Sequence, residues 1–146
     1  MTKSPNRLVA TIFGAVYLLT GLIGFAATSG VGFAAMKGGF LLGIFELNPL
    51  HNIVHLLIGA VLLIGGLSNV SAAKAVNTLV GAVYLLLGIV GFFIVDSTLN
   101  ILALNTGDHF LHLASGVLLL GVGLAGDRSG SGASMTSPRR TRSDTP

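Results

Sequence analysis

The chain has 146 residues, of which 52% are hydrophobic and only 9% are charged. An ordinary soluble domain carries roughly 25% charged residues, so this chain has too little charge to cover a water-facing surface. It contains no cysteine, which excludes disulfides, thiolate metal sites and cysteine nucleophiles. The net charge of +3 comes from basic residues that flank apolar runs or lie in the tail. No basic stripe is interleaved with aromatic residues, so nucleic acid is not an expected partner.

Four apolar runs, at about residues 8–27, 50–67, 75–95 and 109–125, are long enough to cross a bilayer. A membrane span needs about 20 apolar residues, within a range of roughly 17–25. Backbone groups in lipid must satisfy their hydrogen bonds within the segment, so each run is predicted to be a helix. We therefore expect an all-α fold, a bundle of four transmembrane helices within residues 1–126, with the lipid bilayer as its partner.

The basic residues predict the orientation of the chain. If the four spans alternate in direction, seven of the eight lysines and arginines fall on one side, and only Lys37 falls on the other. Cytoplasmic loops are rich in Lys and Arg, so both termini are predicted to be cytoplasmic. Residues 127–146, rich in Ser, Gly and Arg, are predicted to form a disordered cytoplasmic tail. The seven basic residues are Lys3, Arg7, Lys74, Arg128, Arg139, Arg140 and Arg142.

The sequence contains an internal repeat of about residues 7–67 and 74–125. Gly14–Phe25 (GAVYLLTGLIGF) matches Gly81–Phe92 (GAVYLLLGIVGF) at nine of twelve positions, and His55–Leu67 resembles His112–Leu124 in the same way. Each unit holds two spans, so both enter the membrane in the same direction. We expect two tandem parallel helix-loop-helix repeats, related by a pseudo-twofold axis along the membrane normal.

Glycines recur seven residues apart within both units, which places them on nearly one helix face. Small residues there let helix backbones approach closely in a membrane, so these glycines are predicted to lie at helix–helix contacts. They are Gly14, Gly21, Gly59, Gly66, Gly81, Gly88, Gly116 and Gly123.

All four histidines fall in two short segments at the outer ends of the second and fourth spans, Asn48–His55 and Asn105–His112. Asn48 and Asn105 are predicted N-caps, with Asp108 completing a variant of the capping box in the second unit. His51 pairs with His55, and Asp108 with His112, four residues apart on one helix face. The repeat brings these two pairs toward each other.

Two interpretations of this cluster remain open, beside a weaker one of proton sensing or a haem-like ligand. In the first, neutral histidines bond across helices to the surrounding polar residues and hold the two units together. In the second, His51, His55, Asp108 and His112 bind a divalent metal ion, since three imidazoles and one carboxylate suit zinc and several other metals. The expected structural polar cluster around them is Asn48, Asn52, Asn105, His109, Tyr17 and Tyr84.

Two members of that polar cluster carry separate expectations. His109 points about 100° away from the face of the histidine pairs, so it is expected to be an interfacial residue. Tyr17 and Tyr84 lie mid-span and each needs a partner for its hydroxyl group.

The apolar segment Phe40–Phe45 is too short to span the bilayer. We expect it to be a re-entrant or interfacial element, with Leu99–Leu104 as its counterpart, and both to cover the histidine cluster. No nucleophile elbow, phosphate loop or dinucleotide fingerprint occurs. The chain is therefore predicted not to be an enzyme, with no catalytic residues and no cofactor apart from a possible divalent metal ion.

The paired patterns NPLHNIVHLLIG and NTGDHFLHLASG, each following a GAVYLL helix, resemble a bacterial family of four-helix integral membrane proteins known as a domain of unknown function. The resemblance covers about Asn6 to Ala125 and implies four spans in a bacterial inner membrane. It implies no activity. In the family's pattern, Asn stands where this chain has His109, which argues against a ligand role for His109.

Three functions are compatible with these features. The first is a non-enzymatic accessory, assembly or stress-related membrane protein, whose partners are other membrane proteins or further copies of itself. The second is a small metal- or ligand-binding membrane protein with a His/Asp site at the outer ends of the second and fourth spans. The third and weakest is an oligomeric pore or transporter, because four helices with few polar residues offer no conduit by themselves.

Overall fold

The computed structural model of the protein describes residues 4–127 and consists of four long helices and one short hairpin. The elements are α1 (Pro5–Ala27), β1 (Gly39–Leu41), β2 (Phe45–Leu47), α2 (Pro49–Ser68), α3 (Val70–Ile94) and α4 (Thr106–Ala125). Each helix is long and apolar enough to cross a membrane, so the predicted four-helix transmembrane bundle is confirmed. The expectation of a disordered tail concerns residues that lie, apart from Asp127, outside the described part of the chain.

The helices begin where the sequence supplies caps. Pro5 and Pro49 occupy the first turns of α1 and α2, behind the N-caps Ser4 and Asn48. The start of α3 differs from the sequence expectation, because the helix begins at Val70 and not near residue 75. Asn69 explains this early start, since its side chain caps α3 by accepting a hydrogen bond from the Ala72 backbone N–H.

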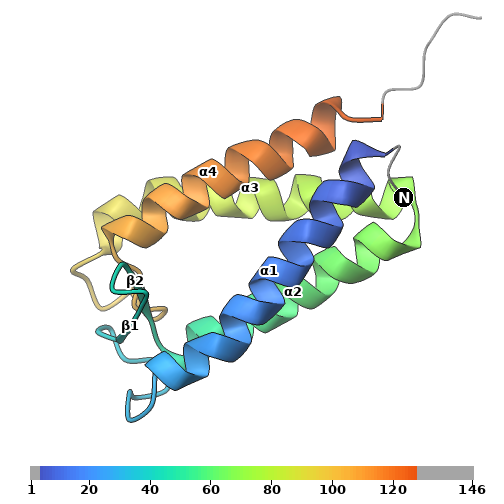
Figure 1. Cartoon of the computed structure of the whole chain (residues 1–146). Coiled ribbons are helices and arrows are strands. Elements are labelled where there is room, and N and C mark those ends of the chain that lie inside the picture. Colours follow the sequence, from blue (N-terminus) through green and yellow to red (C-terminus); the bar gives the residue numbers. More distant parts are fainter. Residues whose placement is uncertain (1–3, 128–146) are drawn as a thin grey trace, which may run out of the picture.

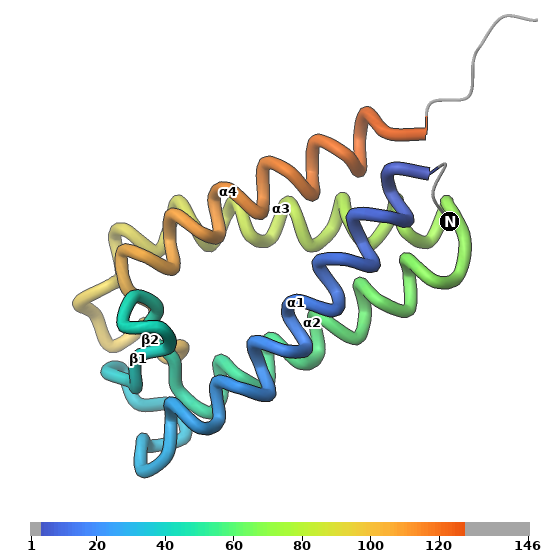
Figure 2. The backbone as a smooth tube through the Cα atoms, in the orientation of Figure 1, coloured from blue at the N-terminus to red at the C-terminus, as the bar shows by residue number. Residues whose placement is uncertain are grey.

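The helices pack as two antiparallel pairs, α1 with α2 and α3 with α4 (Figure 1). Figure 2 shows that the pairs lie close together at the end where residues 4 and 127 meet, which we call the terminal end. They diverge toward the opposite end, where the hairpin lies between them, and which we call the hairpin end.

Glycines make both pairs close. A Cβ added at Gly14 would lie 2.8 Å from the Leu63 Cα, and one added at Gly81 would lie 2.8 Å from the Leu120 Cα. Leu63 and Leu120 occupy matching places in the two sequence units, so each pair closes through the same contact. The pseudo-twofold axis along the membrane normal stays a prediction.

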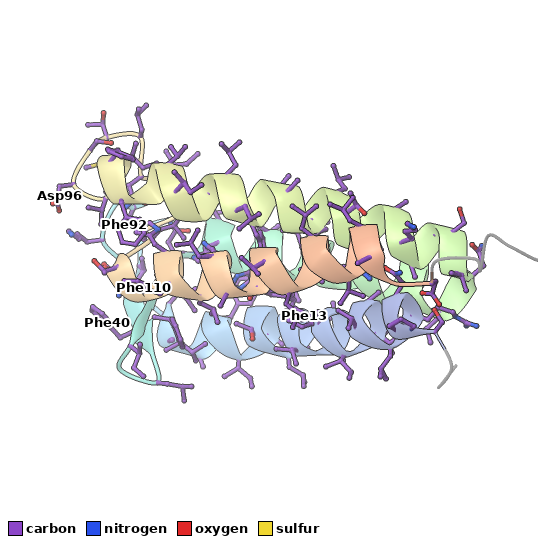
Figure 3. The ribbon with its side chains drawn as sticks, turned by 90° about the horizontal axis from the view of Figure 1, so that it is seen from above. Phe13, Phe40, Phe92, Asp96 and Phe110 are labelled. Atoms are coloured by element: carbon purple, nitrogen blue, oxygen red, sulfur yellow. The ribbon has the colours of Figure 1, made fainter. Side chains whose placement is uncertain are left out.

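The bundle is covered by apolar side chains that project outward, as Figure 3 shows. Phe93, Phe110 and Leu57 are each more than 60% exposed, as suits a surface that faces lipid. The buried interior is narrow and contains aliphatic and aromatic side chains from all four helices. Its members are Ala10, Tyr17, Leu62, Ala73, Val80, Tyr84 and Leu119.

The apolar segment before Glu46 forms an antiparallel hairpin, in which Gly39 pairs with Leu47 and Leu41 with Phe45. At its tip, Leu42 and Gly43 both have positive φ, and Leu42 is 81% exposed. The carboxylate of Glu46 is buried and accepts a hydrogen bond of 2.7 Å from the Gly38 backbone N–H. This bond fixes the hairpin to the loop that precedes it.

A second polar network closes the terminal end. The Oδ2 atom of Asp127 accepts hydrogen bonds from the Ser4 hydroxyl, the Asn6 backbone N–H and the Asn6 side chain, at 2.9–3.1 Å. The side chain of Asn77 in α3 donates to Asn6 in turn. Desolvation raises the pKa of Asp127, but the hydrogen bonds from Asn6 and Ser4 outweigh it, so the pKa lies below its ordinary value. Asp127 therefore joins the end of α4 to the start of α1, although the sequence placed it in the tail.

Candidate functional site: a buried histidine cluster

The side chain of Asn48 holds the N-terminus of α2 through three hydrogen bonds. Its Oδ1 atom accepts a hydrogen bond of 2.8 Å from the His51 backbone N–H, as predicted for a helix cap. Its Nδ2 atom donates to the carbonyl oxygens of Ala35 and Ile101, at 2.9 and 2.7 Å. Asn48 thus ties the first turn of α2 to loops from both halves of the chain, which holds His51 in place.

The N-terminus of α4 carries the capping box that the sequence predicts. Asn105 accepts from the Asp108 backbone N–H, and the Oδ2 atom of Asp108 accepts from the Asn105 backbone N–H. The same Oδ2 atom also accepts a bond of 3.2 Å from the Glu46 backbone N–H, and the Asn105 side chain donates to the Ile44 carbonyl oxygen. The hairpin is therefore fastened to α4, and one oxygen of the Asp108 carboxylate is engaged with two backbone N–H groups.

Three histidines meet between these two helix ends. His51 and His55 lie one turn apart on α2, and His112 faces them from α4. Each ring offers a nitrogen, and these nitrogens all lie within 4.8 Å of one another. The three side chains are only 2–5% exposed. Of the four residues that the sequence nominated as metal ligands, the structure brings these three together, whereas Asp108 is not part of this set.

Aromatic rings form a closed circuit around the cluster. The ring centroids of His51 and His55 are 4.3 Å apart, those of His55 and Tyr17 5.3 Å, and those of Tyr17 and Tyr84 5.3 Å. His112 closes the circuit, at 4.9 Å from Tyr84 and 6.2 Å from His51. Each tyrosine therefore packs on the histidine of its own sequence unit, and the two tyrosines join the units mid-span.

Several polar atoms in this circuit have no hydrogen-bond partner among the described residues. They are the Nδ1 atoms of His51, His55 and His112 and the hydroxyl oxygen of Tyr84. A buried polar atom without a partner costs about 1–3 kcal/mol. Outside the cluster, the Oδ1 atom of Asn52 and both ring nitrogens of His109 likewise have no partner in the part of the chain that the structure describes.

The remaining polar residues point away from the cluster. Asn52 donates a hydrogen bond of 2.9 Å to the Thr28 hydroxyl at the end of α1 and packs against Gly24. His109 occupies the corresponding place in the second unit and packs against Gly91. The residue that matches Thr28 there is Val95, which has no side-chain acceptor.

His109 differs from its expected interfacial position. It is 1% exposed, and neither of its ring nitrogens has a partner in the described part of the chain. The physical reason is the glycine beneath it. Gly91 carries no Cβ, so the ring fits between α3 and α4, where it also packs at a tilt against Phe92, with the ring centroids 5.0 Å apart.

Sequence reasoning gave no structural role to seven buried polar residues, which are Ser4, Asn6, Thr28, Glu46, Asn77, Asn100 and Ser115. Asn77 had a signal, because it is an amide within an apolar run that was itself predicted to span the membrane. Glu46 had none, since a single carboxylate after a short apolar segment is typical of an exposed loop.

The cluster has the donor set of a metal site. Two histidines four residues apart on one helix face, with a third ligand from elsewhere, are a recurrent zinc-binding arrangement. Three protein ligands leave a fourth position open for another group. In zinc proteases of this spacing a glutamate follows the first histidine as general base. Here that residue is Asn52, and its amide is bonded to Thr28.

A family model described as Domain of unknown function (DUF4383) matches residues 7–125. No curated protein and no solved structure matches the chain.

Proposed function

The chain belongs to this family of unknown function, and from that premise we propose that it is a metal-binding accessory protein of the bacterial inner membrane. It binds one divalent transition-metal ion through His51, His55 and His112. The ion stabilises the bundle and serves an assembly or stress-related role and not catalysis.

The observation that carries this proposal is the convergence of three buried imidazoles whose nitrogens lie within 4.8 Å of one another. A purely structural cluster would satisfy its buried nitrogens with hydrogen bonds, because leaving them unpaired is costly. In this cluster the Nδ1 atoms of all three rings have no partner among the described residues. A bound metal ion would provide a partner for one nitrogen of each ring.

The side chains around the cluster favour a binding role over an enzymatic one. The carboxylate of Asp108 is the best candidate for a general base in this site. Its Oδ2 atom accepts two backbone hydrogen bonds. Asn52 carries an amide in place of a carboxylate, and its Nδ2 atom donates to the Thr28 hydroxyl. A general base must be free to take a proton from its substrate, so these groups suit positioning of the helix ends.

The distribution of charge favours an outer location for the cluster. Arg7 and Lys74 lie at the terminal end, where Arg7 also donates hydrogen bonds to the carbonyl oxygens of Gly66 and Leu67. Lys37 lies at the hairpin end, in the loop between α1 and β1. By the rule that basic residues face the cytoplasm, we place the terminal end inside the cell and the cluster near the outer surface.

The test is metal analysis of the purified full chain in detergent. After dialysis against zinc or cobalt, we expect about one ion per chain, measured by mass spectrometry of the metal. His55→Ala and His112→Ala should each weaken metal affinity at least a hundredfold. His109→Ala is the matched control, because His109 is equally buried but lies outside the cluster.

The outcomes separate the metal site from a structural lock. Metal retained by His109→Ala and lost by the two cluster variants supports the proposal. Metal-free wild-type protein, with all three variants equally helical by circular dichroism, would refute it. Metal that binds equally to all four proteins would place the ion elsewhere and refute it as well.

A further inference from the structure

A cavity of about 220 Å³ leads from the lipid-facing surface to the histidine cluster. Its walls come from α1, α4 and the hairpin, and its deep end contains His55, His112 and Asp108. Val16 on α1 and Leu111 on α4 flank it and are 52% and 41% exposed. The cavity therefore opens sideways toward the bilayer and ends at the candidate metal ligands.

The size and lining of the cavity restrict what fits. An engineered apolar cavity of about 150 Å³ holds benzene, so about 220 Å³ accepts a ring of that size or a short alkyl chain. The wall residues Leu41, Leu42 and Phe45 are apolar. The occupant thus has an apolar body and places any polar group at the deep end.

The deep end of the cavity is suited to a polar group. His55 and His112 are 5% and 3% exposed, and the Nδ1 atom of each has no partner among the described residues. Asp108 lines the same cavity but lies outside the set of converging ligand atoms, and its Oδ2 atom is bonded to the backbone of Asn105 and Glu46. A bound metal ion with three imidazole ligands would still require a fourth ligand.

Charge decides the nature of that ligand. Two buried carboxylates lie in this region: Asp108 lines the cavity, and Glu46 follows in the hairpin, where its backbone N–H donates to Asp108 and its carboxylate accepts from the Gly38 backbone N–H. When ionised, the two carboxylates carry as much negative charge as a divalent ion carries positive charge, so the buried region needs no further anion for neutrality. Uncompensated charge is costly in a low-dielectric interior. A neutral oxygen donor therefore fits the fourth position better than an anionic one.

We propose that a neutral membrane-borne amphiphile, an apolar chain or ring with one hydroxyl or carbonyl oxygen, enters between α1 and α4 and places its oxygen on the ion held by His51, His55 and His112. This inference rests on the proposed function, because the ion is the group that the amphiphile completes. No covalent bond of the amphiphile is broken. The site is a receptor for a lipid-soluble molecule.

The test uses the full chain loaded with cobalt, whose visible absorption band reports a change of ligand at the ion. The probes are 1-octanol, octane, which has the same chain without the oxygen, and octanoate, which has an anionic head. We expect 1-octanol to shift the cobalt band and octane to leave it unchanged. Octanoate should bind at least tenfold more weakly than 1-octanol.

The repeat supplies a matched pair of variants. Val16→Phe fills the mouth of the cavity and should weaken the octanol response at least tenfold without loss of cobalt affinity. Val83→Phe changes the corresponding residue of the second unit, which lies on the far side of the bundle between α2 and α3, and should respond like the wild type. Leu111→Phe fills the same mouth from α4, if Val16→Phe does not fold.

The results also distinguish the two proposals. A chain that binds no cobalt refutes the metal site, and the amphiphile site with it. A chain that binds cobalt refutes only the amphiphile site if octane shifts the band as 1-octanol does. The amphiphile site alone is also refuted if a mouth-filling variant keeps the wild-type response to octanol, or if octanoate binds more tightly than 1-octanol.

Discussion

The close contact of α1 and α2 predicts a large cost for a very small change, Gly14→Ala. The new Cβ would lie 2.5 Å from the Leu63 backbone nitrogen, 2.8 Å from the Leu63 Cα and 2.9 Å from the Gly59 carbonyl oxygen. These neighbours are helix backbone atoms, so they move only if the two helices separate. Overpacking of this kind costs about 3 kcal/mol at the upper end of its usual range, and the better helix propensity of Ala returns about 1 kcal/mol. We expect a net loss of about 2 kcal/mol.

The control for this prediction is Gly121→Ala on α4. A Cβ at Gly121 would meet no atom within 4 Å, so only helix propensity should act there. Both free energies of unfolding are measured by titrating micelles with SDS and following helicity by circular dichroism. A Gly14→Ala protein that is as stable as the Gly121→Ala protein would show that the helix pair is looser than the structure requires.

Three further predictions concern single polar groups. The pKa of Asp127 in the folded protein lies below its ordinary value of about 3.8. The contribution of Asp127 to stability is therefore complete above pH 3.8 and is lost as the pH falls through the folded pKa. Asp127→Asn should abolish this loss of stability in acid, which is measured by unfolding the protein at several pH values. Tyr84→Phe removes a hydroxyl without a partner among the described residues, so thermal unfolding of the metal-free chain should show unchanged stability or a gain of about 1 kcal/mol; a clear loss would contradict this. Combining His109→Asn with Val95→Thr copies the polar pair of the first unit, and a double-mutant cycle should give a favourable coupling of about 1 kcal/mol; zero coupling would show that no bond forms.

The four helices could be predicted from the sequence, because a long apolar run in a bilayer must satisfy its own backbone hydrogen bonds and therefore forms a helix. The four spans, the caps at Asn48 and Asn105 and the glycine contacts all follow from local rules that need no knowledge of the rest of the chain. The early start of α3 shows the limit of such rules. An apolar run locates the part of a helix that lies in lipid, whereas Asn69 determines where the helix begins.

The site was predicted less completely, because its details depend on which atoms compete for one another. Spacing placed His51 and His55 on one face, and the internal repeat suggested that His112 would meet them, as it does. Spacing placed Asp108 in the same set, but the backbone N–H of Glu46 reaches that carboxylate from the hairpin. The strands of the hairpin have three residues each, which is too short to give a periodic pattern. No local feature of the sequence therefore predicted the contact between Glu46 and Asp108.

The polar network at the terminal end has a consequence for chain connectivity. The Ser4 hydroxyl and the Asp127 carboxylate are 2.9 Å apart, so the chain enters and leaves the bundle at one point. A short linker between residues 4 and 127, with new ends opened at Asn69, would give a circular permutant in which α3 and α4 precede α1 and α2. Every span would keep its direction, because each unit crosses the bilayer twice. The order of the two halves along the gene is therefore free to change while the folded protein stays the same.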